Sequence, residues 1–171
     1  MALALSESGF SSGNNANFTT VDHSEISGGY MAMTVVGDYN THNYSNHFMN
    51  SYIHGGAYYG VYFLYQDSGL FQNCEITCNN GYPVMAQYVN NSDFLNSEIH
   101  GGYYAFYSYY LKECNIINNQ IYNSYYAGIY SYYSTTINFF HNSVYSDYTN
   151  NPNAFYLYQG CLLYTSDAAD E

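Results

Sequence analysis

The chain of 171 residues almost lacks positive charge: Lys112 is its single basic residue, and arginine is absent. A protein that binds nucleic acid needs cations to displace the counterions of the phosphates, so nucleic acid is excluded as a partner. Docking to an anionic lipid surface is excluded for the same reason. The apolar runs are far too short to span a bilayer, which excludes insertion into a membrane.

Tryptophan is also absent, proline occurs twice, and charged residues make up only 8% of the chain. Tyrosine is abundant instead, with 26 positions in a chain that is 21% aromatic. Disordered chains are poor in aromatic residues, so this composition predicts a folded domain. Tyrosine favours strands, and the chain has no apolar stripe with the 3.6-residue period of a helix. The composition therefore indicates an all-β protein.

An internal repeat determines the predicted architecture. Aliphatic residues recur with spacings of 27, 23, 23, 22 and 23 residues, at Ile26, Ile53, Ile76, Ile99, Ile121 and Val144. A second apolar residue lies five positions before each of them, and an asparagine or histidine lies three positions before. A unit of 22 to 23 residues with short strands and no helix is one rung of a β-solenoid. About six such rungs are expected.

One column of the repeat predicts a ladder of asparagine side chains, which we call the Asn ladder: Asn50, Asn73, Asn96 and Asn118. His23 and His141 occupy the same column at either end. Rungs stack about 4.8 Å apart, so the side chains of one column lie above one another. Asparagine tolerates the left-handed backbone of a tight corner, and its amide both donates and accepts hydrogen bonds. We expect the amides of Asn73 and Asn96 to lie within hydrogen-bond reach.

Two stretches carry a family resemblance: Ala127–Ser131 (Ala-Gly-Ile-Tyr-Ser) and Ile137–Val144 (Ile-Asn-Phe-Phe-His-Asn-Ser-Val). They resemble the right-handed parallel β-helix repeats of the pectin-lyase-like superfamily, over about residues 20–160. The last rung, Asn142–Tyr145 leading to Asn153–Leu157, is similar to repeats of large secreted Bacteroidetes-type surface proteins. The resemblance implies a right-handed parallel β-helix that is secreted or on the cell surface. It does not fix an activity, because the superfamily includes lyases, hydrolases, epimerases, adhesins and spacers.

The repeat divides the chain into three segments. Residues 1–19 are expected to form an irregular N-terminal segment, residues 20–160 the β-helix domain and residues 161–171 a tail. The tail resembles a translated sequencing adapter, the alternative being a genuine acidic tail, and we expect it to pack against nothing. The first residues lack the basic region and the length of a signal peptide. The sequence is therefore interpreted as a fragment whose natural neighbours are the remaining rungs of a longer chain.

The enzymatic chemistry of the superfamily finds little support in these residues. Pectate-lyase chemistry pairs a cationic base with calcium-binding acids, and Lys112 has no matching context. Hydrolysis with inversion needs two carboxylates around a water molecule, whereas the aspartates are scattered. Only Glu75 and Glu98 share a column on adjacent rungs, where a solvated acidic edge and a weak calcium site are the two interpretations. No catalytic residue and no cofactor is predicted.

Histidine and cysteine do not form a predicted metal site either. His54 and His100 are two rungs apart, too far to share one ion, because a bond from histidine to a metal is about 2 Å long. Both are expected to be surface residues beside turns. Cys74, Cys78 and Cys114 are expected to be small buried thiols.

Tyrosine supplies the candidate binding surface. Strand alternation turns two columns outward, and the candidate binding residues in them are Tyr62, Tyr107, Tyr109, Tyr130, Tyr132 and Tyr156. Such rings can stack on a sugar face or contact a protein, although stacking between rungs would stabilise the sheet without any ligand. We therefore expect a non-enzymatic module that binds a glycan or a surface protein or acts as a spacer. The alternative is part of a polysaccharide-active lyase, hydrolase or epimerase whose catalytic rungs lie outside this sequence.

Overall fold

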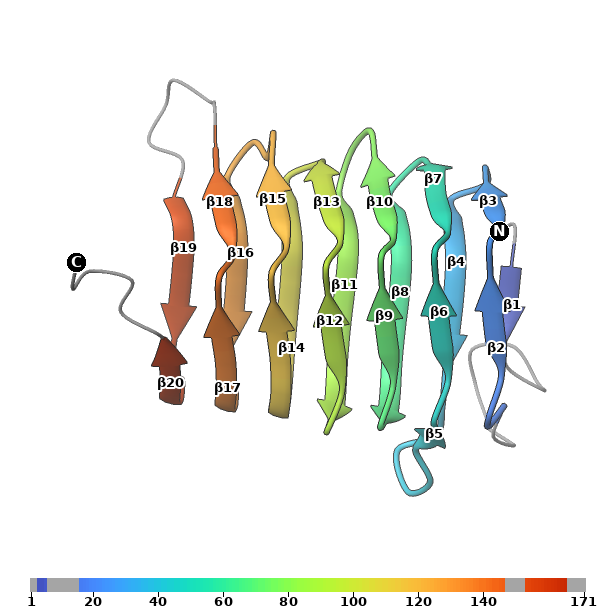
Figure 1. Cartoon of the computed structure of the whole chain (residues 1–171), viewed down its shortest axis with the longest axis horizontal. Coiled ribbons are helices and arrows are strands. Elements are labelled where there is room, and N and C mark those ends of the chain that lie inside the picture. The colour runs from blue at the N-terminus through green and yellow to red at the C-terminus, as the bar shows by residue number, and fades with distance from the viewer. Residues whose placement is uncertain (1–2, 6–15, 147–152, 166–171) are drawn as a thin grey trace.

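A computed structural model describes residues 3–5, 16–146 and 153–165 of the chain, the last five of these by their backbone alone. All strand pairings among them are parallel, and none of these residues is in a helix. The chain winds about six turns around one axis, and like strands of successive rungs lie side by side (Figure 1). The predicted all-β solenoid is confirmed.

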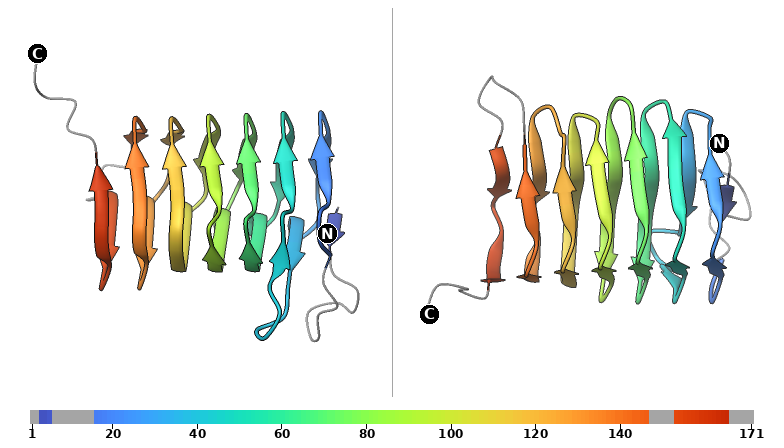
Figure 2. Two further views of the ribbon diagram at one scale, coloured as in Figure 1. Left: turned by 60° about the horizontal axis from the view of Figure 1, so that its bottom comes forward. Right: turned by 45° about the horizontal axis from the view of Figure 1, so that its top comes forward.

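Each rung passes through three walls, which Figure 2 shows from two further sides. The first wall contains β1 (Leu3–Leu5), β4 (Met31–Val36), β8 (Tyr59–Asp67), β11 (Tyr82–Asn90), the first half of β14 (Tyr104–Ile117), β16 (Ala127–Tyr132) and β19 (Asn153–Tyr158). The second wall contains β2 (Thr20–Asp22), β6 (His47–Met49), β9 (Leu70–Gln72), β12 (Asp93–Leu95), the second half of β14, β17 (Thr135–Phe140) and β20 (Cys161–Thr165). The short strand β5 (Asn43–Tyr44) pairs with the end of β8.

The third wall is a separate six-stranded sheet. It consists of β3 (Glu25–Ser27), β7 (Tyr52–Gly56), β10 (Glu75–Cys78), β13 (Glu98–Gly101), β15 (Gln120–Tyr122) and β18 (Ser143–Tyr145). Its register places the aliphatic column of the repeat in one line, from Ile26 through Ile53, Ile76, Ile99 and Ile121 to Val144. The repeat found in the sequence is thus the spatial repeat of the fold.

The interior of the solenoid is filled by these aliphatic side chains and by a column of phenylalanines. Phe48, Phe71 and Phe94 are almost fully buried. The ring of Phe71 stacks on that of Phe48 at 4.8 Å and on that of Phe94 at 5.4 Å. Burial of one such side chain stabilises the fold by about 1.5–3 kcal/mol. The apolar core therefore runs along the axis, and none of the described tyrosine side chains is buried in it.

Corners with a left-handed backbone separate the straight segments of each rung. Three columns of corner residues have φ between 45° and 57°: the Asn-ladder column with its flanking histidines, the column Ser45, Ser68, Asn91, Glu113 and Thr136, and the column Tyr65, Tyr88, Tyr110, Tyr133 and Gln159. A left-handed residue costs about 1–2 kcal/mol unless it is glycine or asparagine. The asparagines therefore suit their corner, whereas the tyrosines occupy theirs at a cost that the stacking of the rungs must offset.

The Asn ladder is present in register but is divided into two parts. The side chain of Asn73 donates to that of Asn50 at 3.0 Å, and Asn118 donates to Asn96 at 2.8 Å. No side-chain bond among the described residues joins Asn73 to Asn96, so that expected contact is wrong. All four amides are exposed, because the left-handed corner turns the side chain away from the core.

The buried amides between rungs belong to the next position in the repeat. Asn119 is 1% exposed. Its Oδ1 accepts from the backbone N–H of Ser97 at 2.9 Å, and its Nδ2 donates to the carbonyl of Phe94 at 2.8 Å. Nδ2 also donates to Asn142 Oδ1 on the following rung at 3.0 Å. These bonds satisfy backbone groups that the corner would otherwise leave unpaired.

Both ends of the described chain take part in the sheets. Leu3–Leu5, within the segment expected to be irregular, forms β1 and pairs with β4. Cys161–Thr165 forms β20 and pairs with β17 in the register Ile137 to Leu163. The expectation that residues 161–171 pack against nothing is therefore wrong for this strand, because an open strand edge is a template for any β-favouring segment that follows. Residues 166–171 lie outside the described part.

Candidate functional site

The six tyrosines singled out in the sequence lie on the outer side of the first wall, in two adjacent columns. The strand register aligns Tyr62, Tyr107, Tyr130 and Tyr156 in one column, which Met85 interrupts. Tyr109 and Tyr132 follow in the second column and continue to Tyr158. The side chains are half-buried or exposed, with Tyr156 and Tyr158 the most accessible. Strand alternation thus predicts their direction correctly.

Two further tyrosine columns flank these two and were not anticipated. Tyr59, Tyr82 and Tyr104 form the column on one side. The corner residues Tyr65, Tyr88, Tyr110 and Tyr133 form the column on the other side. The sequence signal was a tyrosine three residues before or three residues after each member of the column of Tyr62, Met85 and Tyr107. We call these four columns together the tyrosine face.

Most neighbouring rings within a column stack on one another, although Tyr109 and Tyr132 are tilted by 33° at 6.0 Å. Tyr107 and Tyr130 are parallel to within 9° at a centroid distance of 5.2 Å, and Tyr130 and Tyr156 to within 5° at 4.7 Å. Tyr110 and Tyr133 stack in the same way at 5.1 Å. A ring covered on both faces offers a partner only its edge and its hydroxyl group. The tyrosine face is therefore suited to contact through hydroxyl groups and ring edges, because a ring face lacks a stacked neighbour only where a column ends or is interrupted, as at Met85.

Burial and crowding raise the pKa values of three tyrosines of the face, Tyr59, Tyr104 and Tyr107. Burial, with smaller contributions from the neighbouring Tyr58, Tyr62 and Tyr30, raises the pKa of Tyr59 to about 12. Burial is also the main reason that the pKa values of Tyr104 and Tyr107 are raised, since the charged form loses its hydration. The hydroxyl groups of Tyr59, Tyr104 and Tyr107 therefore remain neutral hydrogen-bond donors at neutral and mildly alkaline pH.

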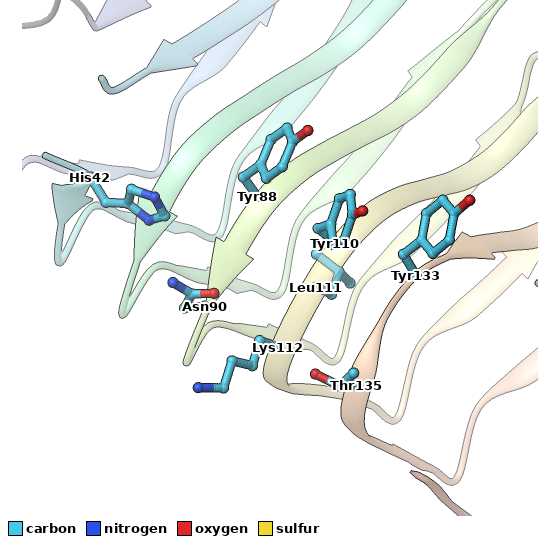
Figure 3. A pocket seen from close by; sticks show the side chains of 8 residues that line it. All are labelled: His42, Tyr88, Asn90, Tyr110, Leu111, Lys112, Tyr133 and Thr135. Atoms are coloured by element: carbon cyan, nitrogen blue, oxygen red, sulfur yellow. The ribbon is translucent and has the colours of Figure 1, made fainter. Parts of the chain in front are cut away.

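The corner column forms one side of a hollow of about 300 Å³, shown in Figure 3. Its lining residues are His42, Tyr88, Asn90, Tyr110, Leu111, Lys112, Tyr133 and Thr135. Lys112, the single cation of the chain, is exposed and lies 3.6 Å from the carboxylate of Glu113. An exposed pair of this kind contributes about 0–1 kcal/mol, so the ammonium group is available to a partner. The hollow extends the tyrosine face with amide, hydroxyl and ammonium groups.

The outer surface of the third wall carries three glutamates and two histidines: Glu25, Glu75, Glu98, His54 and His100. Glu75 and Glu98 are paired across β10 and β13, as the repeat predicts. His100 Nε2 lies 3.2 Å from Glu75 Oε1. Donor atoms of these three side chains all lie within 4.8 Å of one another. The sequence interpretation of His100 as a residue beside a turn missed this grouping, although the i, i+2 spacing of Glu98 and His100 places both on one side of a strand.

His54 contacts a different carboxylate, Glu25, at 2.9 Å. His54 and His100 are indeed two rungs apart, because the Ile53, Ile76 and Ile99 column separates them by one intervening strand. The two-rung separation that the repeat predicts is therefore present.

Nucleophilic cysteine chemistry is disfavoured at the described thiols. Cys74, Cys78 and Cys114 are free and buried, which confirms the sequence prediction. Burial raises the pKa values of Cys78 and Cys114 to about 12, so the reactive thiolate is scarce at neutral pH. On the exposed corner, Asp22 lies 2.9 Å from His23. The hydrogen bond from Asn50 is the main cause that lowers the pKa of Asp22, which suits a charged surface residue.

Comparison with known proteins gives one match. A family model described as "Right handed beta helix region" matches residues 39–168, well over half of the chain. No curated protein and no solved structure matches the chain. The matched range extends past Gly160 and includes β20, in agreement with the strand pairing. No helix of the described chain could cross a membrane.

Proposed function

Because the chain belongs to the right-handed β-helix family, we propose that it acts as a non-enzymatic binding module of a secreted or cell-surface protein. The tyrosine face is its binding surface, and the partner is a neutral, hydroxyl-rich chain such as an uncharged glycan. The observation that carries this proposal is the alignment of four tyrosine columns on one wall. Few soluble proteins expose a continuous surface of aromatic side chains unless it contacts a partner.

The chemistry of the face favours a neutral partner. The formal net charge of −12 repels polyanions, and rows of phenol groups donate and accept hydrogen bonds without carrying charge. Each hydroxyl–hydroxyl bond contributes only about 0.5–1.5 kcal/mol net. Repetition of the same contact on successive rungs therefore supplies the affinity, through the high effective concentration of neighbouring contacts.

The ring geometry permits a sharper test than removal of the rings. Phenylalanine preserves the stacked columns and deletes only the hydroxyl groups. A variant with Tyr107→Phe, Tyr109→Phe, Tyr130→Phe and Tyr132→Phe is compared with the wild type on an array of neutral oligosaccharides. Four lost bonds at the low end of the range above correspond to a loss of about 25-fold in affinity. The matched control carries Tyr44→Phe and Tyr52→Phe, two substitutions that lie outside the face. It should bind as the wild type does.

Three outcomes distinguish the proposal from its alternatives. Equal binding by the four-residue variant, with an unchanged circular dichroism spectrum, would contradict a role of these hydroxyl groups. Absence of binding by the wild type to any neutral glycan would favour a spacer, in which the tyrosines only stabilise the sheet. Calcium-dependent cleavage of a polyanionic glycan would favour the polysaccharide-active enzyme instead.

A further inference from the structure

We propose that Glu75, Glu98 and His100 on the third wall bind a divalent transition-metal ion, for which zinc is the natural occupant. Two adjacent strands supply the three ligands. Glu98 and His100 lie two residues apart on β13 and therefore on the same side of it, and Glu75 is the direct partner of Glu98 on β10. Their donor atoms lie within 4.8 Å of one another, so small side-chain rotations bring all three to one ion at bond lengths of about 2.0–2.2 Å.

A neighbouring tyrosine holds two of the ligands in place. The ring of Tyr122 stacks on that of His100 at 4.7 Å with 8° between the planes. Its hydroxyl group donates to Glu98 Oε2 at 3.2 Å. Outer partners of this kind orient metal ligands and are worth about 10- to 100-fold in metal affinity. Tyr122 is thus a positioning residue, which reaches both the histidine and one carboxylate from the next rung.

The local charge also points to a cation. Like charges directly opposite one another on paired strands are destabilising, and Glu75 and Glu98 stand opposite one another. The only lysine of the chain, Lys112, lies on β14 beside Glu113 and cannot neutralise them. A bound divalent ion removes this repulsion between the two carboxylates.

The mixture of ligands selects the kind of ion. Calcium and magnesium prefer sites made of oxygen atoms alone, and calcium takes six to eight of them. One imidazole nitrogen with two carboxylates suits zinc, which water completes to four ligands. Among divalent first-row ions, affinity for such a site rises from manganese to copper and falls again at zinc, so copper is the competitor to include in the titration.

The chain contains a natural comparison two rungs earlier. His54 contacts Glu25 of the preceding rung, just as His100 contacts Glu75. The position that Glu98 holds beside His100 is held by Tyr52 beside His54, where the tyrosine ring stacks on the imidazole at 4.1 Å. This second pair therefore lacks the third ligand. It should bind zinc only weakly.

The proposal is tested on the full chain without a histidine tag. Zinc is titrated by calorimetry, and cobalt is used as a spectroscopic substitute whose visible absorption reports the ligands. We expect one equivalent to bind, with an affinity that falls by about 100-fold or more in Glu98→Gln and in His100→Gln, since a direct ligand should matter at least as much as an outer partner. Tyr122→Phe should weaken binding by about tenfold and keep the cobalt spectrum. The paired control, Glu25→Gln with His54→Gln, should bind as the wild type does.

A gain-of-function variant completes the design. Tyr52→Glu supplies the missing carboxylate beside Glu25 and His54 and should raise the stoichiometry above one. Unchanged zinc affinity in His100→Gln would overturn the proposal, as would a sulfur-to-cobalt charge-transfer band, which would place the ion on a cysteine. A preference for calcium over zinc would overturn it too. Because this site and the tyrosine face lie on different walls, the four-residue phenylalanine variant should keep its zinc affinity, so the two proposals fail independently.

Discussion

At the scale of single residues, the corners depend on one recurring hydrogen-bond arrangement. The residue after a left-handed corner uses a short polar side chain to accept from the backbone N–H of the preceding rung. The hydroxyl groups of Ser51, Ser92, Ser97 and Ser134 do this at 2.9–3.2 Å. Each of these hydroxyl groups also donates to the backbone carbonyl of the residue two positions earlier in the sequence. Asn119 performs the same task for Ser97 with an amide.

Replacement of Asn119 tests this arrangement. Asn119→Ala removes the acceptor of the Ser97 N–H and a donor to the carbonyl of Phe94, and we expect a loss of about 2–4 kcal/mol in unfolding free energy. Asn119→Ser should recover most of that loss, because serine fills the equivalent position on other rungs. Asn96→Ala, at an exposed corner, should cost less than about 1.5 kcal/mol. Urea denaturation followed by circular dichroism measures all three, and equal losses for Asn119→Ala and Asn119→Ser would contradict the hydrogen-bond explanation.

At the scale of elements, the tyrosine columns hold the strands of the first wall together. Stacked contacts run from strand to strand within a column, and edge-to-face contacts such as that of Tyr104 with Tyr107 at 5.8 Å join the columns. Aromatic pairs of this kind contribute about 0.5–1.5 kcal/mol each beyond their buried area. The same burial that stabilises the sheet also disfavours the charged form of the phenols.

Alkaline pH should therefore unfold the protein. The folded-state pKa of Tyr59 is about 12 against 10.0 for a free tyrosine, and those of Cys78 and Cys114 are about 12 against 9.0 for a free thiol. The unfolded chain releases these protons first, so their contribution to stability is complete below about pH 9 and is lost as the pH rises to about 12. The urea midpoint should fall steadily across that interval. Ultraviolet titration that shows all tyrosines ionising together near pH 10 in the folded protein would contradict this expectation.

Strand β20 should contribute to the thermal stability of the solenoid. Deletion of residues 161–171 removes the partner of β17, and we expect the midpoint of thermal unfolding to fall by a few degrees. Deletion of residues 166–171 alone keeps β20 and separates its contribution from that of the rest. An unchanged midpoint after the longer deletion would show that β20 adds nothing to the stability of the solenoid.

The sequence predicts columns well and side-chain groupings less well. The Ile and Phe columns are visible because one periodic property, apolar character, determines where they go. The tyrosine corners at Tyr65 and Tyr88 escape notice because tyrosine has no preference for a left-handed backbone, so only stacking between rungs explains them. His100 escapes because its partner, Glu75, lies on another rung, and a search for pairs of histidines does not reveal a mixed set of ligands.

At the scale of the whole molecule, the net negative charge lowers the stability of the folded state. Thirteen acidic residues are opposed by one lysine, which gives a formal net charge of −12. Self-repulsion of this kind destabilises a compact state. Each rung contacts only its neighbours, so the stability is close to a sum of terms for successive rungs.

Added salt should consequently stabilise the protein. The screening length falls from about 30 Å at 0.01 M to about 10 Å at 0.1 M ionic strength, which removes most repulsion between distant acids. We expect the thermal midpoint to rise over this interval and to level off above it. Sodium chloride and potassium chloride should act alike, because screening depends on ionic strength. A midpoint that is flat or falls with salt would show that the acids do not repel one another appreciably in the folded state.

The stacked columns also determine the fluorescence of the molecule. With no tryptophan in the chain, tyrosine alone emits in the near ultraviolet. Rings whose centroids are 4.5 Å apart, as in Tyr132 and Tyr158, or 5.2 Å apart, as in Tyr107 and Tyr130, exchange excitation far faster than they emit. Excitation absorbed on one rung is therefore passed to rings on neighbouring rungs before it is emitted, and because stacked rings such as Tyr107 and Tyr130 are nearly parallel, transfer within a column changes the ring orientation little. Excitation energy is therefore transferred from strand to strand along the first wall of the solenoid.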